Sequence, residues 1–261
     1  RPSEAVLLGN LGDAYRRFGQ PARALEYLQQ ALAITREVGQ RQREASVLSS
    51  IGNAQYDLRD YGASLKSFRQ AIALQREIGS RSGEAAALAE MAATQAALNQ
   101  LSRAADSYQQ SLVLLQKTGN RGREAAAWAG RAGGQAGQKR YDDAARNAQQ
   151  ALVVAQEVGS PDLQWRAWDT LADVALRRGN PEQSIFYRKQ AVNLIQSLRA
   201  SALSLDKELQ RSLVQNKEQV YRSLADTMIA RGRLAEAEQV MSMLKEEEYF
   251  DFIRRDATTD A

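Results

Sequence analysis

The sequence predicts an all-α fold, a right-handed α-solenoid of about six stacked helical hairpins. Three observations predict it. Single residues recur at a spacing of 40, apolar residues follow helical spacing within each repeat, and glycine or proline separates the helical segments. Because one hairpin cannot bury its apolar faces alone, we expect the copies to stack into one elongated unit rather than two compact domains.

The repeat is visible in several columns of the sequence. One column of glutamates, each followed by alanine, consists of Glu4, Glu44, Glu84 and Glu124. A column of glycines has the same spacing and consists of Gly39, Gly79, Gly119 and Gly159. The columns divide residues 1–203 into five units of 40 residues, at 4–43, 44–83, 84–123, 124–163 and 164–203.

Each unit contains two predicted helices. In the first unit, Leu8, Leu11 and Tyr15 have the spacing of one helical face, and the break "FGQP" follows them. Pro21 suits the first turn of the second helix, where a missing N–H costs little. That helix is expected to end at Gly39, because glycine is the usual residue just past a helix end.

A sixth unit follows an insertion. Leu224 and Ala237 match Leu11 and Ala24 at an offset of 213 instead of 200, so 13 residues are inserted. We expect a helix extension at 204–216, a sixth unit at 217–253 and a tail at 254–261. Residues 182–231 contain no glycine or proline. This absence predicts two unusually long helices with a break near 201–206.

The composition limits the chemistry. Cysteine and histidine are absent, which excludes disulfides, thiolate or imidazole metal sites and catalytic groups built on either residue. The net charge is +4, and the charges are mixed rather than gathered into the basic stripe of a nucleic-acid binder. No apolar run reaches the ~18 residues that span a bilayer. We therefore expect no enzymatic activity, no cofactor, no metal, no nucleic-acid partner and no membrane partner.

The repeat resembles the tetratricopeptide repeat, which places Leu-Gly and Tyr in the first helix, then Ala and an aromatic residue in the second. The matching residues of the first unit are Leu11, Gly12, Tyr15, Ala24 and, in place of the aromatic residue, Leu28. Phe68 and Tyr108 hold the aromatic position in the next two units, whereas Ala148 and Arg188 depart from the pattern. The resemblance covers about residues 4 to 200, and it implies a solenoid that binds a protein or peptide.

The C-terminal part carries a second resemblance, to the tetratricopeptide segment that precedes a CHAT domain, a caspase-like peptidase fold, in bacterial proteins. The resembling residues are Tyr221, Leu224, Gly232, Arg233, Glu236, Ala237, Leu244, Lys245, Glu248 and Tyr249. It implies that the chain is the sensor or regulatory arm of such a protein, with an attached C-terminal domain beyond Ala261. The alternative is a free-standing peptide-binding adaptor or regulator of the quorum-sensing type. The chain begins with Arg1, so we expect a piece of a longer polypeptide, cytoplasmic or exported.

In a tetratricopeptide superhelix the first helices line the concave groove. The first and second units are then expected to turn inward Val6, Gly9, Asp13, Arg16, Arg17, Ser46, Ser49, Asn53, Tyr56 and Asp57. Small residues replace them in the third and fourth units, where "AAAWAGRAGGQAGQ" carries four glycines on one helical face.

These residues predict a groove with a smooth floor and polar anchors at both ends, on which a helix or extended segment of a partner lies. The candidate ligand-binding residues are Arg16, Asn53, Tyr56, Asp57, Ala93, Ala97, Gly133, Gly137, Asp173 and Arg177. The alternative is that the small residues only tighten the superhelix.

Overall fold

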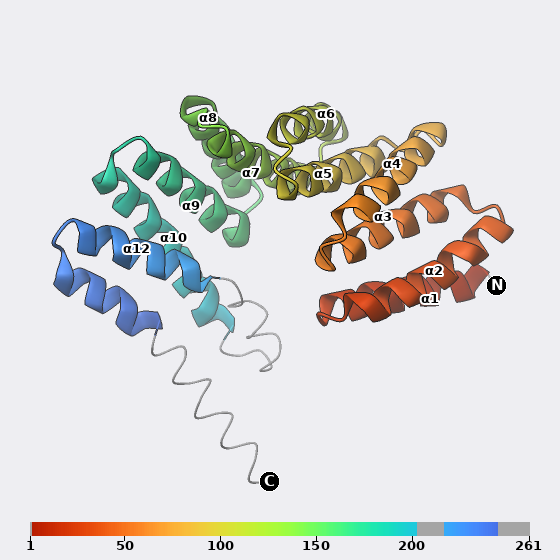
Figure 1. Cartoon of the computed structure of the whole chain (residues 1–261), viewed down its shortest axis with the longest axis horizontal. Helices are drawn as coiled ribbons and strands as arrows, with labels where there is room; N and C mark the ends of the chain where they lie inside the picture. Colours follow the sequence, from red (N-terminus) through yellow and green to blue (C-terminus); the bar gives the residue numbers. More distant parts are fainter. Residues whose placement is uncertain (1, 203–216, 245–261) are drawn as a thin grey trace, which may run out of the picture. The chain divides into compact units, whose positions relative to one another are not determined.

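A computed structural model of the chain describes residues 2–202 and 217–244. Regular secondary structure in these ranges is helical throughout, which confirms an all-α solenoid of repeats (Figure 1). None of the helices described there is long and apolar enough to cross a membrane. The sequence predicts a single elongated stack, whereas the structure divides into two compact units, Arg1–Arg140 and Tyr141–Ala261.

The first unit is a succession of helices of nearly equal length. They are α1 (Pro2–Arg17), α2 (Pro21–Glu37), α3 (Arg41–Asp57), α4 (Tyr61–Glu77), α5 (Arg81–Ala97), α6 (Leu101–Thr118) and α7 (Arg121–Gly137). The second unit contains α8 (Tyr141–Glu157), α9 (Pro161–Arg177), α10 (Pro181–Ala202) and α12 (Glu218–Ala230), followed by helical residues 234–244.

Local sequence explains where these helices start and stop. Pro21 begins α2, and the side chain of Asp60 caps α4 by accepting a hydrogen bond from the backbone N–H of Ala63. The second residue after the first helix of a repeat has a left-handed backbone, with φ of 72° at Gly19 and 61° at Arg59. Glycine takes this conformation freely, whereas a side chain such as that of Arg59 costs about 1 kcal/mol there.

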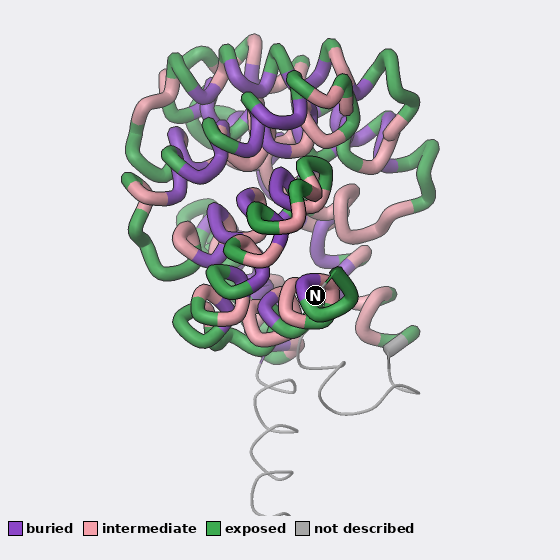
Figure 2. The backbone as a smooth tube through the Cα atoms, turned by 90° about the vertical axis from the view of Figure 1, so that its right-hand side faces the viewer, coloured by how far each residue is buried: buried purple, intermediate pink, exposed green. Residues whose placement is uncertain are grey.

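In the first unit each helix buries one side against its neighbours in the chain, so buried and exposed residues alternate along it (Figure 2). Phe68 of α4 is fully buried at the aromatic position of its repeat. Its ring explains Gly52 on α3, because a Cβ atom there would lie 2.8 Å from the Cζ atom of Phe68. The small residue lets the two helices of the hairpin approach closely.

The second unit has its own core, formed by α10, α12 and residues 234–244 around the fully buried side chains of Tyr221, Leu224 and Met228. Helix α10 has 22 residues against 17 in α9, so it is long, as expected. It is linked to the following hairpin by ion pairs, including Lys189 to Glu236 at 2.7 Å.

The second long helix, expected after residue 206, falls largely on residues outside the described ranges and stays a prediction; in the described part α12 begins at Glu218. Lys217 precedes it outside the helix and is 5% exposed, with its Nζ atom 5.9 Å from the centre of the Trp165 ring. The expected extension at 204–216, the end of the sixth unit at 245–253 and the tail at 254–261 lie outside the described residues.

Candidate functional site

The inner face of the first unit is formed by the first helices of the repeats. Helices α1, α3, α5 and α7 contact one another in turn, in addition to their chain neighbours. Figure 1 shows α3 and α5 on the inner side of the arc and α4 and α6 on its outer side. The candidate residues on these helices are all at least partly exposed; they are Arg16, Asn53, Tyr56, Asp57, Ala93, Ala97, Gly133 and Gly137.

The structure brings three of these candidates together across α1 and α3. The Nη1 atom of Arg16 donates a hydrogen bond of 3.1 Å to the Oδ2 atom of Asp57, and about a third of each side chain is exposed. Tyr56 lies beside them, with its ring 5.4 Å from the ring of Tyr61. Burial raises the pKa of Tyr56, and the negative charges of Asp57 and Glu90 raise it further. The phenol is therefore neutral and can donate a hydrogen bond.

Glu90 belongs to this inner face, although sequence analysis treats its surroundings as a smooth alanine wall. It lies on α5, in the same column of the repeat as Asn10 and Ser50. Burial raises the pKa of its carboxyl group, whereas the positive charges of Arg123 and Arg16 lower it. The available signal was one charged residue within the alanine-rich stretch "AALAEMAATQAA".

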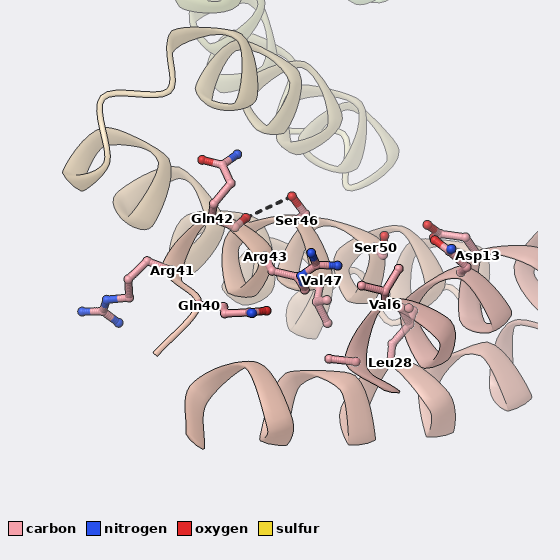
Figure 3. A pocket seen from close by; sticks show the side chains of 13 residues that line it. Val6, Asp13, Leu28, Gln40, Arg41, Gln42, Arg43, Ser46, Val47 and Ser50 are labelled. Atoms are coloured by element: carbon pink, nitrogen blue, oxygen red, sulfur yellow. Dashed lines mark hydrogen bonds between the residues drawn. The ribbon is translucent and has the colours of Figure 1, made fainter. Parts of the chain in front are cut away.

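A hollow of about 500 Å³ opens between the N-terminal halves of α1 and α3. Its lining includes four residues that the repeat register predicts to point inward, namely Val6, Gly9, Asp13 and Ser46. Val47 of α3 adds an apolar side chain, and the lining also includes Leu28 of α2, which is fully buried. Figure 3 shows Arg43 and Val47 on the side of α3 that faces Val6 and Leu28, whereas Arg41 points away. The predicted anchors Arg16 and Asp57 lie beyond this hollow, toward the other end of the same helices.

The hollow contains polar groups that the fold leaves without partners. Arg43 and Asp13 make no ion pair or hydrogen bond through their side chains with any other described residue. The Oε1 atom of Gln40 is buried and likewise has no hydrogen-bond partner. Ser46 donates its hydroxyl to the backbone carbonyl of Gln42 at 3.1 Å. A ligand could therefore meet a cation, an anion and an amide acceptor around an apolar floor.

The glycine-rich face of α7 is divided between packing and exposure, which corrects the expectation of one continuous groove wall. A Cβ atom at Gly130 would lie 2.4 Å from the Cζ and Oη atoms of Tyr108, so this glycine makes room for the tyrosine. Gly134 is buried. Gly133 and Gly137 are exposed, and a Cβ atom at Gly133 would have no neighbour within 4 Å.

Asp173 and Arg177 lie on α9 in the second unit. The carboxylate of Asp173 is already engaged by Arg188 of α10. Arg188 is 3% exposed and also contacts Asp169 at 3.2 Å and the hydroxyl of Thr227 at 3.5 Å. The arginine that breaks the aromatic column thus ties α9 to α12. Asp173 stays a predicted ligand contact, with an internal partner that sequence analysis missed.

In the described ranges, acidic residues form no group of three or more that could hold a metal ion. The inner face of the first unit carries hydrogen-bonding groups, charged side chains and apolar surface. Such an arrangement suits recognition of another molecule.

Comparisons with known proteins identify the repeat. Residues 1–37 and residues 45–78 each match a family model of the tetratricopeptide repeat. No curated protein matches the sequence.

Solved structures share the fold at low sequence identity. A putative kinesin light chain with TPR-like repeats from Podosopora anserina has a TM-score of 0.62 at 16% identity, covering 78% of this chain and 99% of that chain. A signal transduction ATPase with a tetratricopeptide repeat sensor from Pyrococcus horikoshii has a TM-score of 0.68 at 17% identity, covering 98% of this chain and 38% of that chain. Aspartyl phosphate phosphatase F from Bacillus subtilis has a TM-score of 0.68 at 13% identity, covering 94% and 60% respectively. At these identities the likeness shows the fold.

Proposed function

Because the chain is a tetratricopeptide repeat protein, we propose that it is a non-catalytic scaffold that binds a protein or peptide segment on the inner face of its first unit. The hollow between α1 and α3 carries this proposal. The apolar side chains of Val6 and Val47 in this hollow would contact an apolar side chain of the segment. Arg43 and Asp13, which the fold leaves unpaired, would meet polar groups on either side.

The candidate residues further along the same face extend this surface. Arg16, Asn53, Tyr56 and Asp57 would fix the register of the bound segment through hydrogen bonds. Ala93, Ala97, Gly133 and Gly137 would let its backbone approach closely. On the second unit, taken by itself, Asp173 and Arg177 stay predicted ligand contacts. Their partial exposure is compatible with these roles.

The hollow can be tested by filling it. We would select peptides from a display library on the whole chain and measure their dissociation constants by fluorescence polarisation. Ser46→Trp places a ring over the hollow and is expected to weaken binding at least tenfold, about 1.4 kcal/mol. Gln70→Trp, at an exposed position on α4, is the matched control and should bind like the natural chain. Equal affinities of the two variants would contradict the proposal.

A second pair of variants tests the smooth floor. Ala93→Leu and Gly133→Leu each add a bulky side chain to the inner face, and the space at Gly133 is open. We expect both to abolish binding of the selected peptides while the circular dichroism spectrum stays helical. Unchanged affinity with an unchanged spectrum would show that the segment does not lie on these helices.

A finer proposal concerns biological context. The C-terminal resemblance supports a role as the sensor or regulatory arm of a bacterial CHAT-domain protein, and the repeats of the Pyrococcus neighbour are named a sensor. The alternative remains a free-standing peptide-binding regulator. Sequencing the gene distinguishes them. Several hundred codons after Ala261 that encode a His-Cys dyad favour the first, and a stop codon soon after it favours the second.

A further inference from the structure

We propose that α1 is covered by the second helix of a further tetratricopeptide hairpin, which precedes residue 1 in the protein's own chain and brings a basic residue to Glu4. The surface that this helix covers, called the α1 surface below, consists of Glu4, Leu7 and Leu11 on one face of α1. None of the three lines the hollow between α1 and α3, so this surface is separate from the proposed peptide site.

The α1 surface is exposed, although the repeat buries the same positions elsewhere. Leu7 is 69% exposed, whereas the residues at the equivalent position of α3, α5, α7 and α9 are at most 5% exposed; they are Val47, Ala87, Ala127 and Ala167. Leu11 is 40% exposed, and its equivalent on α3, Ile51, is 5% exposed. Helix α1 thus presents to solvent a face that the repeat is built to bury.

The helix that covers this face in the other repeats is always the second helix of the preceding repeat. Val47 and Ile51 of α3 belong to one apolar cluster with Leu28 and Ala31 of α2. In the same way, Ala87 of α5 shares a cluster with residues of α4, and Ala127 of α7 with residues of α6. Helix α1 lies at one end of the first unit and contacts α2 and α3 (Figure 1). A helix equivalent to α2 would therefore fit on its other side.

Charge indicates which residue that helix carries. The Nε atom of Arg36, in the last turn of α2, lies 2.9 Å from the Oε1 atom of Glu44 on α3. Arg76 of α4 and Glu84 of α5 form the same ion pair eight residues apart in the sequence. Glu4 holds this glutamate position on α1, but it is exposed and pairs with no other described residue. An arginine or lysine eight residues before Glu4 would complete the column.

The alternative, that α1 ends the solenoid, fits this surface less well. A terminal repeat needs a polar outer face, because no neighbour shields it from water. Single exposed leucines are common on protein surfaces. Here, however, Leu7 and Leu11 lie four residues apart on one helical face, and both occupy positions that are buried in other repeats. The outer face of α1 is thus that of an internal repeat.

A fused hairpin tests whether the α1 surface accepts such a helix. The probe is a second copy of residues 41–80, joined directly before residue 1 so that the period of 40 is kept. We expect amide hydrogen exchange in α1 to be at least tenfold slower in the fused chain than in the chain of residues 1–261. Unchanged exchange in α1 would overturn the proposal.

Point variants show whether the named residues form the contact. Leu7→Glu should cancel the slower exchange in the fused chain and leave exchange unchanged in the chain of residues 1–261, where Leu7 is exposed. Glu4→Arg, which sets two cations against each other, should speed α1 exchange at least threefold in the fused chain only. Val113→Glu, at an exposed apolar position on α6, is the matched control and should change neither chain. Equal effects of Leu7→Glu and Val113→Glu would contradict the proposal.

The gene and the solution state identify the source of the helix. Before Glu4 we expect a glycine five codons upstream and a basic residue eight codons upstream, as Gly39 and Arg36 precede Glu44. A preceding segment without this register, or a start codon close to Arg1, would overturn the proposal. Analytical ultracentrifugation of the chain of residues 1–261 provides a further test. A dimer that Leu7→Glu dissociates would make a second copy the occupant and overturn the proposal, while the proposed peptide site would stand.

Discussion

The ring of Tyr108 on α6 limits the size of the side chain that position 130 on α7 can have. Tyr108 is 7% exposed, and its ring ends where the side chain of residue 130 would begin. Glycine in a helix costs up to about 1 kcal/mol relative to alanine, so this position gives up local stability to admit the ring. Gly133, one turn away, also lowers helix stability, but no neighbouring atom requires a glycine there.

These two glycines make a matched pair for mutation. Gly130→Ala brings a methyl group to 2.4 Å from Tyr108, and we expect it to lower the free energy of unfolding by about 1 to 3 kcal/mol. Gly133→Ala meets open space and should raise it by about 0.5 to 1 kcal/mol through helix propensity. Urea denaturation followed by circular dichroism measures both. Changes of the same sign would mean that the ring does not occupy the space at Gly130.

Glu90 predicts a pH dependence of stability. Burial raises its folded pKa above the ordinary value, with Asp57 adding to the rise and Arg123 and Arg16 opposing it. As pH rises, the unfolded chain loses this proton first, so the folded state binds more protons and its stability falls across that interval. Tyr56 and Tyr108 have raised pKa values and stay neutral there.

Glutamine has no proton to lose at this position. Relative to the natural chain, Glu90→Gln should therefore gain stability between about pH 4 and about pH 7, which paired urea titrations at the two values would measure. A stability difference that is the same at both values would show that the carboxyl group has an ordinary pKa.

At the scale of the element, the junction between successive repeats carries a recurring polar contact. Arg36 donates to Glu44 at 2.9 Å, and Arg76 pairs with Glu84 in the same register. In the third junction Gln116 replaces the arginine and contacts Glu124 at 3.4 Å. The glutamate column of the sequence therefore marks the start of each first helix and also its attachment to the preceding second helix.

The first and last glutamates of this column, Glu4 and Glu124, differ in burial, so mutating both tests whether the junction contact stabilises the fold. Glu124 is 2% exposed and accepts hydrogen bonds from Arg121, Gln116 and Trp128. Glu124→Ala leaves these donors without their acceptor and should cost about 1 to 3 kcal/mol in chemical denaturation. Glu4 is the equivalent residue of α1 and is exposed, so Glu4→Ala should change stability by less than about 0.5 kcal/mol. If both mutations lowered the free energy of unfolding equally, the glutamates would act on the helix terminus and not through the contact between repeats.

At the scale of the whole molecule, the apolar clusters follow the division into two units. The clusters around Leu28, Leu48 and Tyr108 lie within residues 1–140, and the cluster around Leu224 lies within residues 141–261. Stability in a solenoid is approximately a sum of terms for neighbouring helices. Damage to one cluster should therefore remain largely within its own unit.

Hydrogen exchange can test this division. Leu224 is fully buried, and Leu224→Ala should cost about 2 to 5 kcal/mol in the second unit. We expect faster amide exchange in α10 and α12, with unchanged protection in α3 and α4. Leu28→Ala, at another fully buried position, should show the reverse pattern. Loss of protection in both units from either mutation would mean that the chain unfolds as one cooperative body.

The sequence by itself determined the all-α solenoid class and the 40-residue period, because helix spacing, prolines and glycines act within a few residues of one another. Tertiary structure decided what each inward position became. Gly130 makes room for the ring of Tyr108, and the carboxylate of Asp173 pairs with Arg188. It also left the buried Oε1 atom of Gln40, in the hollow beside Arg43, without a hydrogen-bond partner. These contacts depend on the distances between side chains of different helices. A periodic pattern along the sequence does not contain those distances.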